Sequence, residues 1–222
     1  MKICELRNIE KKYTKGEEVI PLRDINLEAD PGDFIAIEGP SGTGKSTLLY
    51  VIGTLLKSDE GNLIINGRKV RDLSEAELTD LRASEIGFIF QDSNMIQALT
   101  LKENLEFAER IGKGRKGYES RAAEYLEKLG LDDRADYLPY QLSGGQRRRA
   151  MVARALINSP KLILADEPTN DLDDVWSEKV MALLKEECKK GAAVIMVTHN
   201  DKWVEGTDKK YRLSDGVLET VK

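Results

Sequence analysis

Hydrophobic positions change their spacing along this chain, and the changes divide it into segments of different predicted structure. In the first third, apolar residues occur in short runs or alternate with polar ones, which is typical of strands separated by turns. Pro31-Gly32 marks one such turn, and a helical pattern runs from Gly44 to Leu56. Strands are predicted at residues 19–28, 34–39, 62–67 and 86–90.

The middle of the chain has a helical pattern. Residues 102–111 and 118–129 place apolar side chains at helical spacing, and Gly130 follows where a helix would end. Another helix is predicted from about Ser143. The middle therefore forms a helical region between two parts that contain strands.

The last third alternates between short apolar runs and helices. The runs 162–165 and 193–197 are separated by a helical pattern over 174–190, and a short strand pair is expected around Ser214-Asp215-Gly216. Both runs are too short and too uniformly apolar for exposed strands, so they indicate parallel strands buried on both faces. The predicted fold class is α/β, with a mainly parallel sheet, an antiparallel β part near the start and a helical insertion.

Composition restricts the range of functions. A length of 222 residues allows one large α/β domain or two small ones. The formal net charge of −5 argues against a protein that coats nucleic acid, so no nucleic-acid partner is expected. Cys4 and Cys188 follow no metal or redox spacing and are interpreted as buried or idle thiols of a reducing compartment.

Neither a membrane span nor a signal peptide is recognisable in the sequence. No stretch approaches the roughly 18 to 20 consecutive apolar residues that span a bilayer, and residues 1–13 are charged throughout. We therefore expect a cytoplasmic protein, and any action at a membrane requires a partner that spans it.

A glycine-rich segment after the predicted strand at 34–38 carries the clearest chemistry. It matches the pattern G-x-x-x-x-G-K-[ST] and opens a predicted helix, as a phosphate-binding loop requires. Its glycines allow a tight turn whose N–H groups face a polyphosphate, Lys45 reaches the β- and γ-phosphates, and the Ser46 hydroxyl ligates Mg²⁺. The candidate phosphate-binding residues are Gly39, Pro40, Ser41, Gly42, Thr43, Gly44, Lys45, Ser46 and Thr47.

Polar residues at two further strand ends complement this loop. Asp166 and Glu167 follow the apolar run at 162–165, at the edge of a parallel sheet where ligands gather. Asp166 is placed to bind Mg²⁺, and Glu167 is the candidate that polarises the attacking water. His199, the single histidine, follows the run at 193–197 and is expected to hydrogen-bond the γ-phosphate and steady that water.

The segment LSGGQ, residues 142–146, supplies a second device for binding anions. Ser143 is a good N-cap, and Gly144 and Gly145 leave N–H groups uncovered at the head of a helix. Two such devices in one small domain suggest that each nucleotide contacts both, one from each of two subunits. The candidate residues of this second device are Ser143, Gly144, Gly145 and Gln146.

In this order and spacing, the phosphate loop, LSGGQ, the acidic pair and His199 make the chain resemble the ATP-binding subunits of ABC transporters, over nearly its whole length from Tyr13. The resemblance implies a P-loop NTPase core that hydrolyses ATP with Mg²⁺. It implies a head-to-tail dimer that holds two ATP molecules between the loop of one chain and LSGGQ of the other. It also implies that Tyr13 stacks on adenine, that Gln91 contacts Mg²⁺ and senses the γ-phosphate, and that Asp173 lies in the loop that crosses the dimer interface.

Four positions depart from the pattern of this family. Gln97 replaces a proline in the stretch that faces the membrane partner, Asn170-Asp171 replaces a pair of small residues, and Asn200 replaces an aspartate. Arg147-Arg148-Arg149 stands where glutamines are frequent, and a solvated helix face is the interpretation preferred over charge contacts. These differences concern coupling, whereas the set of ATP-site residues is complete.

Residues 88–105 and 164–174 are similar to the group of this family that serves lipoprotein release, macrolide and peptide export, and cell-division signalling. The resemblance implies a protein peripheral on the inner face of the cell membrane. It would drive a separate permease as a homodimer and export peptide, lipoprotein or drug-like cargo. One alternative is a regulator of the cell-division type that moves no substrate. Another is a soluble ATPase that acts on ribosomes or DNA.

The chain is expected to be a single ABC ATPase domain, residues 1–222. Residues 1–90 and 160–222 form its core with the antiparallel β part, and residues 91–159 form a helical subdomain that includes LSGGQ.

Overall fold

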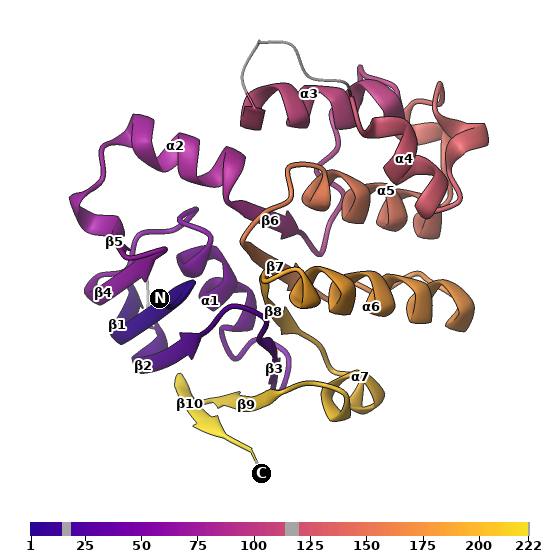
Figure 1. Cartoon of the computed structure of the whole chain (residues 1–222). Coiled ribbons are helices and arrows are strands. Elements are labelled where there is room, and N and C mark those ends of the chain that lie inside the picture. Colours follow the sequence, from indigo (N-terminus) through magenta and orange to yellow (C-terminus); the bar gives the residue numbers. More distant parts are fainter. Residues whose placement is uncertain (15–18, 114–119, 222) are drawn as a thin grey trace.

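The computed structural model describes residues 1–14, 19–113 and 120–221, and Figure 1 shows their arrangement. Two sheets form the framework. In the first, all neighbouring strands are antiparallel and their order is β2-β1-β4-β5. Its strands are β1 (Cys4–Tyr13), β2 (Val19–Ala29), β4 (Glu60–Ile65) and β5 (Arg68–Lys69).

The second sheet lies at the centre of the molecule and has the order β10-β9-β3-β8-β7-β6. Neighbours from β9 to β6 are parallel, and β10 pairs antiparallel with β9. This order brings the carboxyl ends of β3, β7 and β8 to one edge, where ligands bind in open parallel sheets. Its strands are β3 (Phe34–Glu38), β6 (Ile86–Ile89), β7 (Leu162–Asp166), β8 (Ala193–Val197), β9 (Lys209–Ser214) and β10 (Val217–Thr220).

Side chains of the central strands alternate between two hydrophobic cores. Ile35 and Ile37 of β3 pack with helix α1 (Lys45–Ile52) and the antiparallel sheet, whereas Phe34 and Ala36 pack with helices on the opposite face. Every residue of β7 and β8 is buried. Coverage on both faces is the reason that these strands are continuous apolar runs, and it confirms the predicted buried parallel strands.

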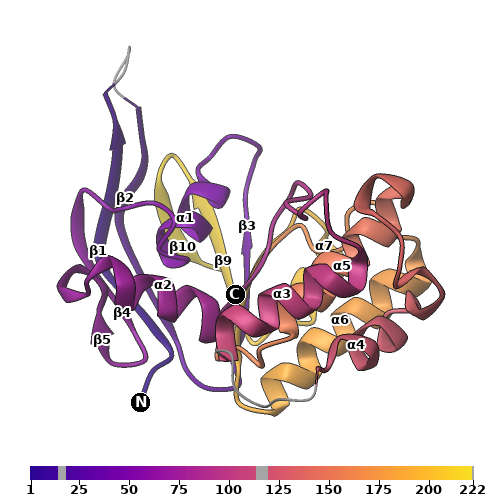
Figure 2. The ribbon, with the colours of Figure 1, turned by 90° about the horizontal axis from the view of Figure 1, so that it is seen from above.

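The helices divide between the two faces of the central sheet. In two perpendicular views the antiparallel sheet lies on one side and α3 to α6 lie on the other (Figures 1 and 2). The latter helices are α3 (Leu101–Lys113), α4 (Ala122–Lys128), α5 (Gly144–Leu156) and α6 (Asp174–Lys189). The remaining helices are α2 (Glu75–Ser84) and α7 (Asp201–Glu205), with 3-10 turns at Val70–Asp72, Asp132–Arg134 and Pro139–Gln141. No helix in the described ranges is long and apolar enough to cross a membrane.

The predicted α/β class, with its parallel sheet, antiparallel part and helices, is confirmed, but several element ends differ. The first helix ends at Ile52 instead of Leu56, because Thr54 has a φ of 57° that ends helical geometry. The strand predicted to end at position 67 ends at Ile65, because Asn66 and Gly67 form a turn with positive φ. Positions 118 and 119 of the predicted helix 118–129 lie outside the described residues. Strand β1 and helices α2 and α7 were not predicted.

Candidate nucleotide-binding site

The candidate phosphate loop leaves the end of β3 and turns into α1, as the sequence predicts. Gly44 is the N-cap of α1 and has a φ of 100°; a Cβ here would lie 2.6 Å from the carbonyl oxygen of Pro21. Gly39 is equally constrained, because a Cβ would overlap the carbonyl group of Leu213. The loop therefore requires glycine at both positions, and it lies at the head of a helix, where an anion is stabilised.

Lys45 folds back over this loop. Its Nζ donates hydrogen bonds to the carbonyl oxygens of Gly39 and Pro40, both at 2.7 Å. Thr43 Oγ1 donates a further bond to the Pro40 carbonyl, at 2.9 Å. These bonds order the loop and keep a positive charge against it, which is the arrangement that a polyphosphate needs.

Asp166, the last residue of β7, is held in an apolar environment. It is 2% exposed and shares a hydrogen bond with the Ser46 hydroxyl of α1. Its Oδ2 atom is buried and has no hydrogen-bond partner. Burial raises the pKa of this carboxyl group above its ordinary value, and the bond to Ser46 opposes the rise. A buried carboxylate oxygen without a protein partner is unusual, and such an oxygen is suited to bind a cation.

These oxygen atoms fit Mg²⁺. In nucleotide sites this hard cation keeps several waters and is bound by one or two protein oxygens together with substrate phosphates. The Ser46 hydroxyl and the free Asp166 oxygen are such ligands, and Gln91 lines the same cavity. Across the described ranges, no group of three or more His, Cys, Asp or Glu residues could hold a metal ion.

Glu167 and His199 meet at the same edge of the sheet. Nδ1 of His199 lies 2.8 Å from Oε1 of Glu167, although 32 positions separate them in the chain. Glu167 is 8% exposed, and its N–H donates to the carbonyl of Val197, the last residue of β8. Its φ of 49° is unfavourable for a glutamate, and such conformations cluster at functional sites. A carboxylate held by a neighbouring imidazole is suited to orient and polarise a water molecule.

One cavity of about 500 Å³ joins these groups. The predicted residues along its wall are Tyr13, Ser41, Gly42, Gly44, Lys45, Ser46, Thr47, Gln91, Asp166, Glu167 and His199. Val19, Pro21 and Val197 also line it and were not predicted. Val19 enters because it pairs with Tyr13 across β1 and β2, a contact that no local motif reveals. Asn170, which the sequence marks only as a departure, lies along the same wall.

The LSGGQ segment forms a second cavity of about 490 Å³ that shares no lining residue with the first. Ser143 caps α5 as predicted, and the Gln146 side chain accepts a bond from the Ser143 N–H in return. Asp173 lies in the same cavity and is the N-cap of α6, accepting from the N–H of Trp176 at 2.8 Å. The second cavity also contains Gly144 and Gly145, so all the predicted residues of this device lie together.

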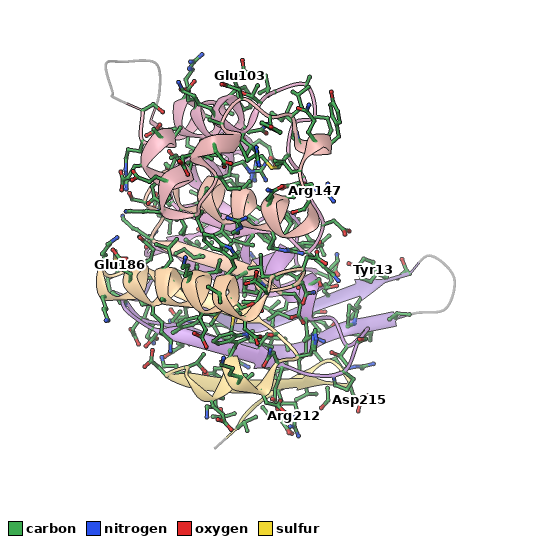
Figure 3. The ribbon with its side chains drawn as sticks, turned by 90° about the vertical axis from the view of Figure 1, so that its right-hand side faces the viewer. Tyr13, Glu103, Arg147, Glu186, Arg212 and Asp215 are labelled. Atoms are coloured by element: carbon green, nitrogen blue, oxygen red, sulfur yellow. The ribbon has the colours of Figure 1, made fainter. Side chains whose placement is uncertain are left out.

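The head of α5 and the end of β1 lie on the same side of the molecule. Figure 3 shows this side, with Tyr13 from the end of β1 and Arg147 from the first turn of α5. Within one chain the two cavities remain separate, which agrees with the expectation that a nucleotide contacts LSGGQ of a second chain.

The arginine run after LSGGQ corrects the preference for a solvated helix face. Arg148 is 5% and Arg149 is 9% exposed. Arg149 donates to the carbonyls of Leu129 and Gly130 and stacks on Trp176, with its guanidinium carbon 3.9 Å from the ring centroid. The prediction failed because a short polar run gives no sign that α5 is surrounded by packed elements on most of its circumference.

Two other departures have local partners. The Gln97 side chain donates to the Met95 carbonyl at 3.2 Å. Asn200 is the N-cap of α7, and its Oδ1 accepts from the N–H of Lys202 at 3.1 Å. Asparagine and aspartate cap helices about equally well, so this replacement keeps the cap.

Comparison with known proteins points to one family. Residues 22–170 match the family described as ABC transporter. An uncharacterised ABC transporter ATP-binding protein of Methanocaldococcus jannaschii, MJ0796, is 43% identical over 224 residues, which covers 98% of this chain and 95% of that protein. The macrolide export ATP-binding/permease protein MacB of Salmonella typhimurium is 43% identical over 218 residues, covering 97% of this chain and 34% of MacB.

The similarity extends to three dimensions. A dimeric structure of the ATP-binding cassette MJ0796, in a post-hydrolysis state bound to ADP and Pi, matches with a TM-score of 0.91 at 40% sequence identity. The match covers 99% of each chain. The fold is therefore shared over nearly the whole length of both chains.

Proposed function

This chain belongs to the ABC transporter family and is an ATP-hydrolysing subunit of it, and from that premise we propose that it drives a separate membrane permease in the direction of export. The observation that carries the ATP-driven part of the proposal is the separation of two candidate anion-binding cavities in one chain, which a second copy would bring together. The related MacB, which is named for macrolide export and joins ATP-binding and permease functions, supports export over the cell-division alternative. On this proposal the protein is peripheral on the inner face of the cell membrane.

In the proposed mechanism ATP occupies the cavity of about 500 Å³. Adenine stacks on Tyr13, and the N–H groups of residues 39–47 face the phosphates. The Lys45 ammonium exchanges its two carbonyl partners for phosphate oxygens, which are stronger acceptors because they are charged. Bound Mg²⁺ would neutralise phosphate charge, and Ser46, Gln91 and Asp166 would hold it.

Closure of the homodimer completes the site. In the second copy, the Ser143 hydroxyl and the backbone N–H groups of Gly144 and Gly145 at the head of α5 contact the γ-phosphate, with Gln146 holding the cap. Glu167 accepts a hydrogen bond from the attacking water, and His199 holds Glu167 and contacts the γ-phosphate. In-line attack then gives ADP and phosphate, and like charges on the products favour reopening.

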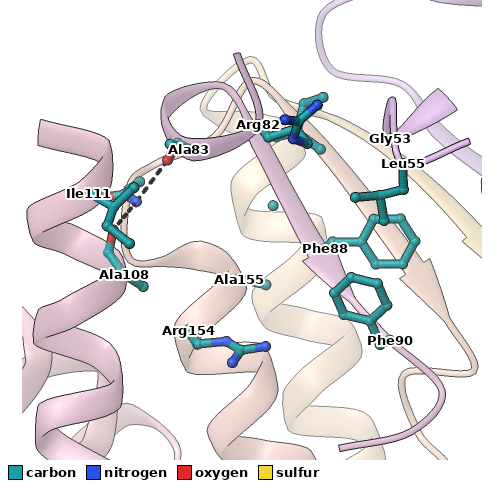
Figure 4. Close-up of a pocket in the computed structure, with 13 residues that line it drawn as sticks. Gly53, Leu55, Arg82, Ala83, Phe88, Phe90, Ala108, Ile111, Arg154 and Ala155 are labelled. Atoms are coloured by element: carbon teal, nitrogen blue, oxygen red, sulfur yellow. Dashed lines mark hydrogen bonds between the residues drawn. The ribbon is translucent and has the colours of Figure 1, made fainter. Parts of the chain in front are cut away.

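The permease is proposed to dock on an apolar groove beside β6, shown in Figure 4. Phe88 and Phe90 stack there with ring centroids 4.0 Å apart. Leu55 and Ile111 line the groove and are 49% and 52% exposed, and exposed apolar surface of this kind marks an interaction site. Phe90, which lines the groove, directly precedes Gln91 in the chain. A movement of Gln91 at the nucleotide can therefore be transmitted to the groove.

The first experiment measures the mass of Glu167→Gln by light scattering, with and without Mg²⁺ and ATP. The amide keeps the shape of the site but cannot accept a proton, so the bound ATP should persist and hold two copies together. We expect a monomer of 24.9 kDa without ATP and twice that mass with it.

The control for this experiment adds Lys45→Ala to the same variant, which removes the phosphate-binding cation and should leave a monomer under both conditions. If Glu167→Gln binds ATP, yet remains monomeric at the highest concentration measured, the composite site is wrong. Rapid hydrolysis by Glu167→Gln would overturn the role given to Glu167.

A further inference from the structure

Arg148 makes an unusual set of contacts for a residue of the α5 helix. Its Nη1 donates to the carbonyl of Phe90 and its Nη2 donates to the carbonyl of Gln91, both at 2.6 Å. Nη2 also lies 3.9 Å from Oδ2 of Asp171. Arg148 is 5% exposed, so these partners replace nearly all of the water that a guanidinium would otherwise bind.

The three partners belong to two different parts of the site, and Arg148 itself belongs to a third. Phe90 and Gln91 form the connection that leaves β6, and Gln91 lines the nucleotide cavity. Asp171 lies in the connection between β7 and α6, four positions after Glu167. Arg148 itself is one turn along the helix that Ser143 caps.

The Asp171 connection also packs directly on LSGGQ. A Cβ on Gly145 would lie 2.8 Å from the carbonyl oxygen of Asp171, so the two backbones are in close contact. The charges that act on Arg148 come from acids of the site, namely Asp171, Asp166, Asp92 and Glu167. A single buried cation is thus surrounded by the segments that carry the candidate magnesium ligands, the candidate base and the candidate anion site.

We propose that Arg148 is a positioning residue: its fork of hydrogen bonds fixes the Gln91 side chain for Mg²⁺ and ties that position to LSGGQ. This inference rests on the role of Gln91 in the proposed function. Two carbonyls fixed by one planar guanidinium leave the backbone before Gln91 little freedom to rotate. Because Arg148 is part of α5, a movement of LSGGQ onto a second nucleotide moves Gln91 as well.

A purely structural role is the competing explanation, and Arg154 provides the matched control. Arg154 is on the same helix, and it donates to the backbone carbonyl of Asn94, in the same connection, at 2.9 Å. It also bonds the Asn94 side chain. Substitution of Arg154 therefore removes the same type of bond between the same two segments. Its hydrogen bonds go to Asn94 and not to Gln91 or Asp171.

The test compares Arg148→Gln with Arg154→Gln by titrating Mg²⁺ at saturating ATP. Loss of a residue that orients a metal ligand typically weakens metal affinity by about 10 to 100 times. We expect Arg148→Gln to raise the Mg²⁺ concentration for half-maximal hydrolysis at least tenfold, and Arg154→Gln to change it less than twofold. Binding of ATP without Mg²⁺ should stay within twofold of the parent in both variants.

A double-mutant cycle with Gln91→Ala separates positioning from general loosening. If Arg148 acts through the Gln91 side chain, adding Arg148→Gln to Gln91→Ala should change the Mg²⁺ concentration for half-maximal hydrolysis less than twofold. Hydrogen exchange of the nucleotide-free protein is a second readout: amides of residues 91–93 should exchange faster in Arg148→Gln and not in Arg154→Gln.

Equal shifts in the two arginine variants, or an Arg148 effect that persists in full beside Gln91→Ala, would overturn the positioning role. These outcomes leave the proposed function intact, because the parent still hydrolyses ATP with Mg²⁺. If the Glu167→Gln variant, with Arg148 unchanged, forms no ATP-dependent dimer, the proposed function itself is contradicted. Arg148→Lys is expected to recover only part of the Mg²⁺ affinity, because an ammonium lacks the planar fork.

Discussion

At the scale of single residues, two adjacent acids at the end of β7 are in opposite environments. Glu167 has a partner, the imidazole of His199, at 2.8 Å. Asp166 is nearly fully buried, and one of its oxygens has no partner. On the proposed mechanism the first arrangement prepares a base, whereas the second leaves a negative charge that burial disfavours and that a bound cation would offset. We therefore expect Asp166 to lower the stability of the nucleotide-free protein.

Asp166→Asn should stabilise the nucleotide-free protein at pH 7. Because burial raises the pKa of Asp166 in the folded state, the native protein holds this proton more tightly than the unfolded chain does. The stability of the parent therefore falls as the pH rises from the unfolded value of about 4 through the folded pKa. Scanning calorimetry should show Tm about 2–4 °C higher in the variant at pH 7, equivalent to about 1 kcal/mol.

The gain should shrink as the pH falls through about 4, because below it the Asp166 carboxyl group is protonated in the folded and the unfolded protein alike, and ATP hydrolysis with Mg²⁺ should be lost at every pH. A variant that melts at or below the parent temperature at pH 7 would contradict the account of an unfavourable buried charge.

Single residues were predictable where a local pattern carries them. Lys45, Asp166 and His199 follow strand ends in motifs that can be recognised from neighbours in sequence. Val19 and Pro21 were not predictable, because they come to the cavity through the pairing of β1 and β2. The burial of Arg148 depends on contacts with residues 57 and 58 positions away, and charge alone favoured water.

At the scale of elements, the same capping device serves two helices with different tasks. Ser74 and Glu77 form a capping box at the head of α2, and Ser143 and Gln146 form one at the head of α5. The first satisfies N–H groups at the surface, and none of its residues lines the nucleotide cavity. The second is placed where a phosphate is proposed to bind. Comparing the two caps separates the effect of a cap on the free energy of unfolding from its effect on ATP hydrolysis.

Ser74→Ala and Ser143→Ala should each lower the free energy of unfolding by about 1 kcal/mol, since each removes an N-cap acceptor. Their effects on ATP hydrolysis should differ. Ser74→Ala should leave turnover within about twofold of the parent, whereas Ser143→Ala should lower it at least about tenfold, as loss of one donor to a reacting oxygen does. Urea unfolding and a steady-state ATPase assay measure the two quantities; equal turnover in both variants would remove Ser143 from the site.

Elements were predictable where their hydrophobic period is regular. β7, β8 and α6 are regular, and their observed bounds fall within one residue of those predicted. Helix α2 buries only Leu81, so its apolar pattern is weak, although the S-x-x-E sequence from Ser74 to Glu77 marks its start. β1 contains register shifts after Leu6 and Ile9 that interrupt the alternation of a strand.

At the scale of the whole molecule, the central sheet separates two working surfaces. The candidate nucleotide cavity lies at the carboxyl edge of the parallel strands, and the apolar groove lies beside β6 at the sheet's border. The predicted division into residues 1–90 with 160–222 and residues 91–159 stays a proposal. It places the Gln91 connection and α5 in one part and the phosphate loop in the other. Both parts must therefore move together if closure is to reach the groove.

Leu55→Asp and Ile111→Asp should weaken docking of the permease on the groove while leaving the ATP site unchanged. Both side chains are about half exposed, so a charge there costs little stability but opposes apolar docking. We expect hydrolysis by the isolated subunit to stay within about twofold of the parent, because neither residue lines the nucleotide cavity. Membrane vesicles that each carry one permease of the source organism should stimulate ATP hydrolysis by the variants at least about tenfold less than they stimulate the parent.

Val217→Asp is the control for this experiment, because Val217 is 44% exposed on β10 and does not line the groove. If no permease stimulates the parent chain, the proposal of a membrane partner is contradicted. If the groove variants are stimulated as strongly as Val217→Asp, the docking surface lies elsewhere.

The position of β3 in the central sheet determines when the phosphate loop can form during synthesis of the chain. β3 leads into the phosphate loop, yet its two neighbours are β8 and β9, at residues 193–197 and 209–214. On the ribosome β3 emerges before both of these partners, with the whole helical region made in between. A nascent chain therefore cannot hold β3 in its native sheet position until residues 193–214 have emerged. The phosphate loop, which begins at the end of β3, is fixed in place only after that point, so shorter nascent chains are kept from competing for nucleotide.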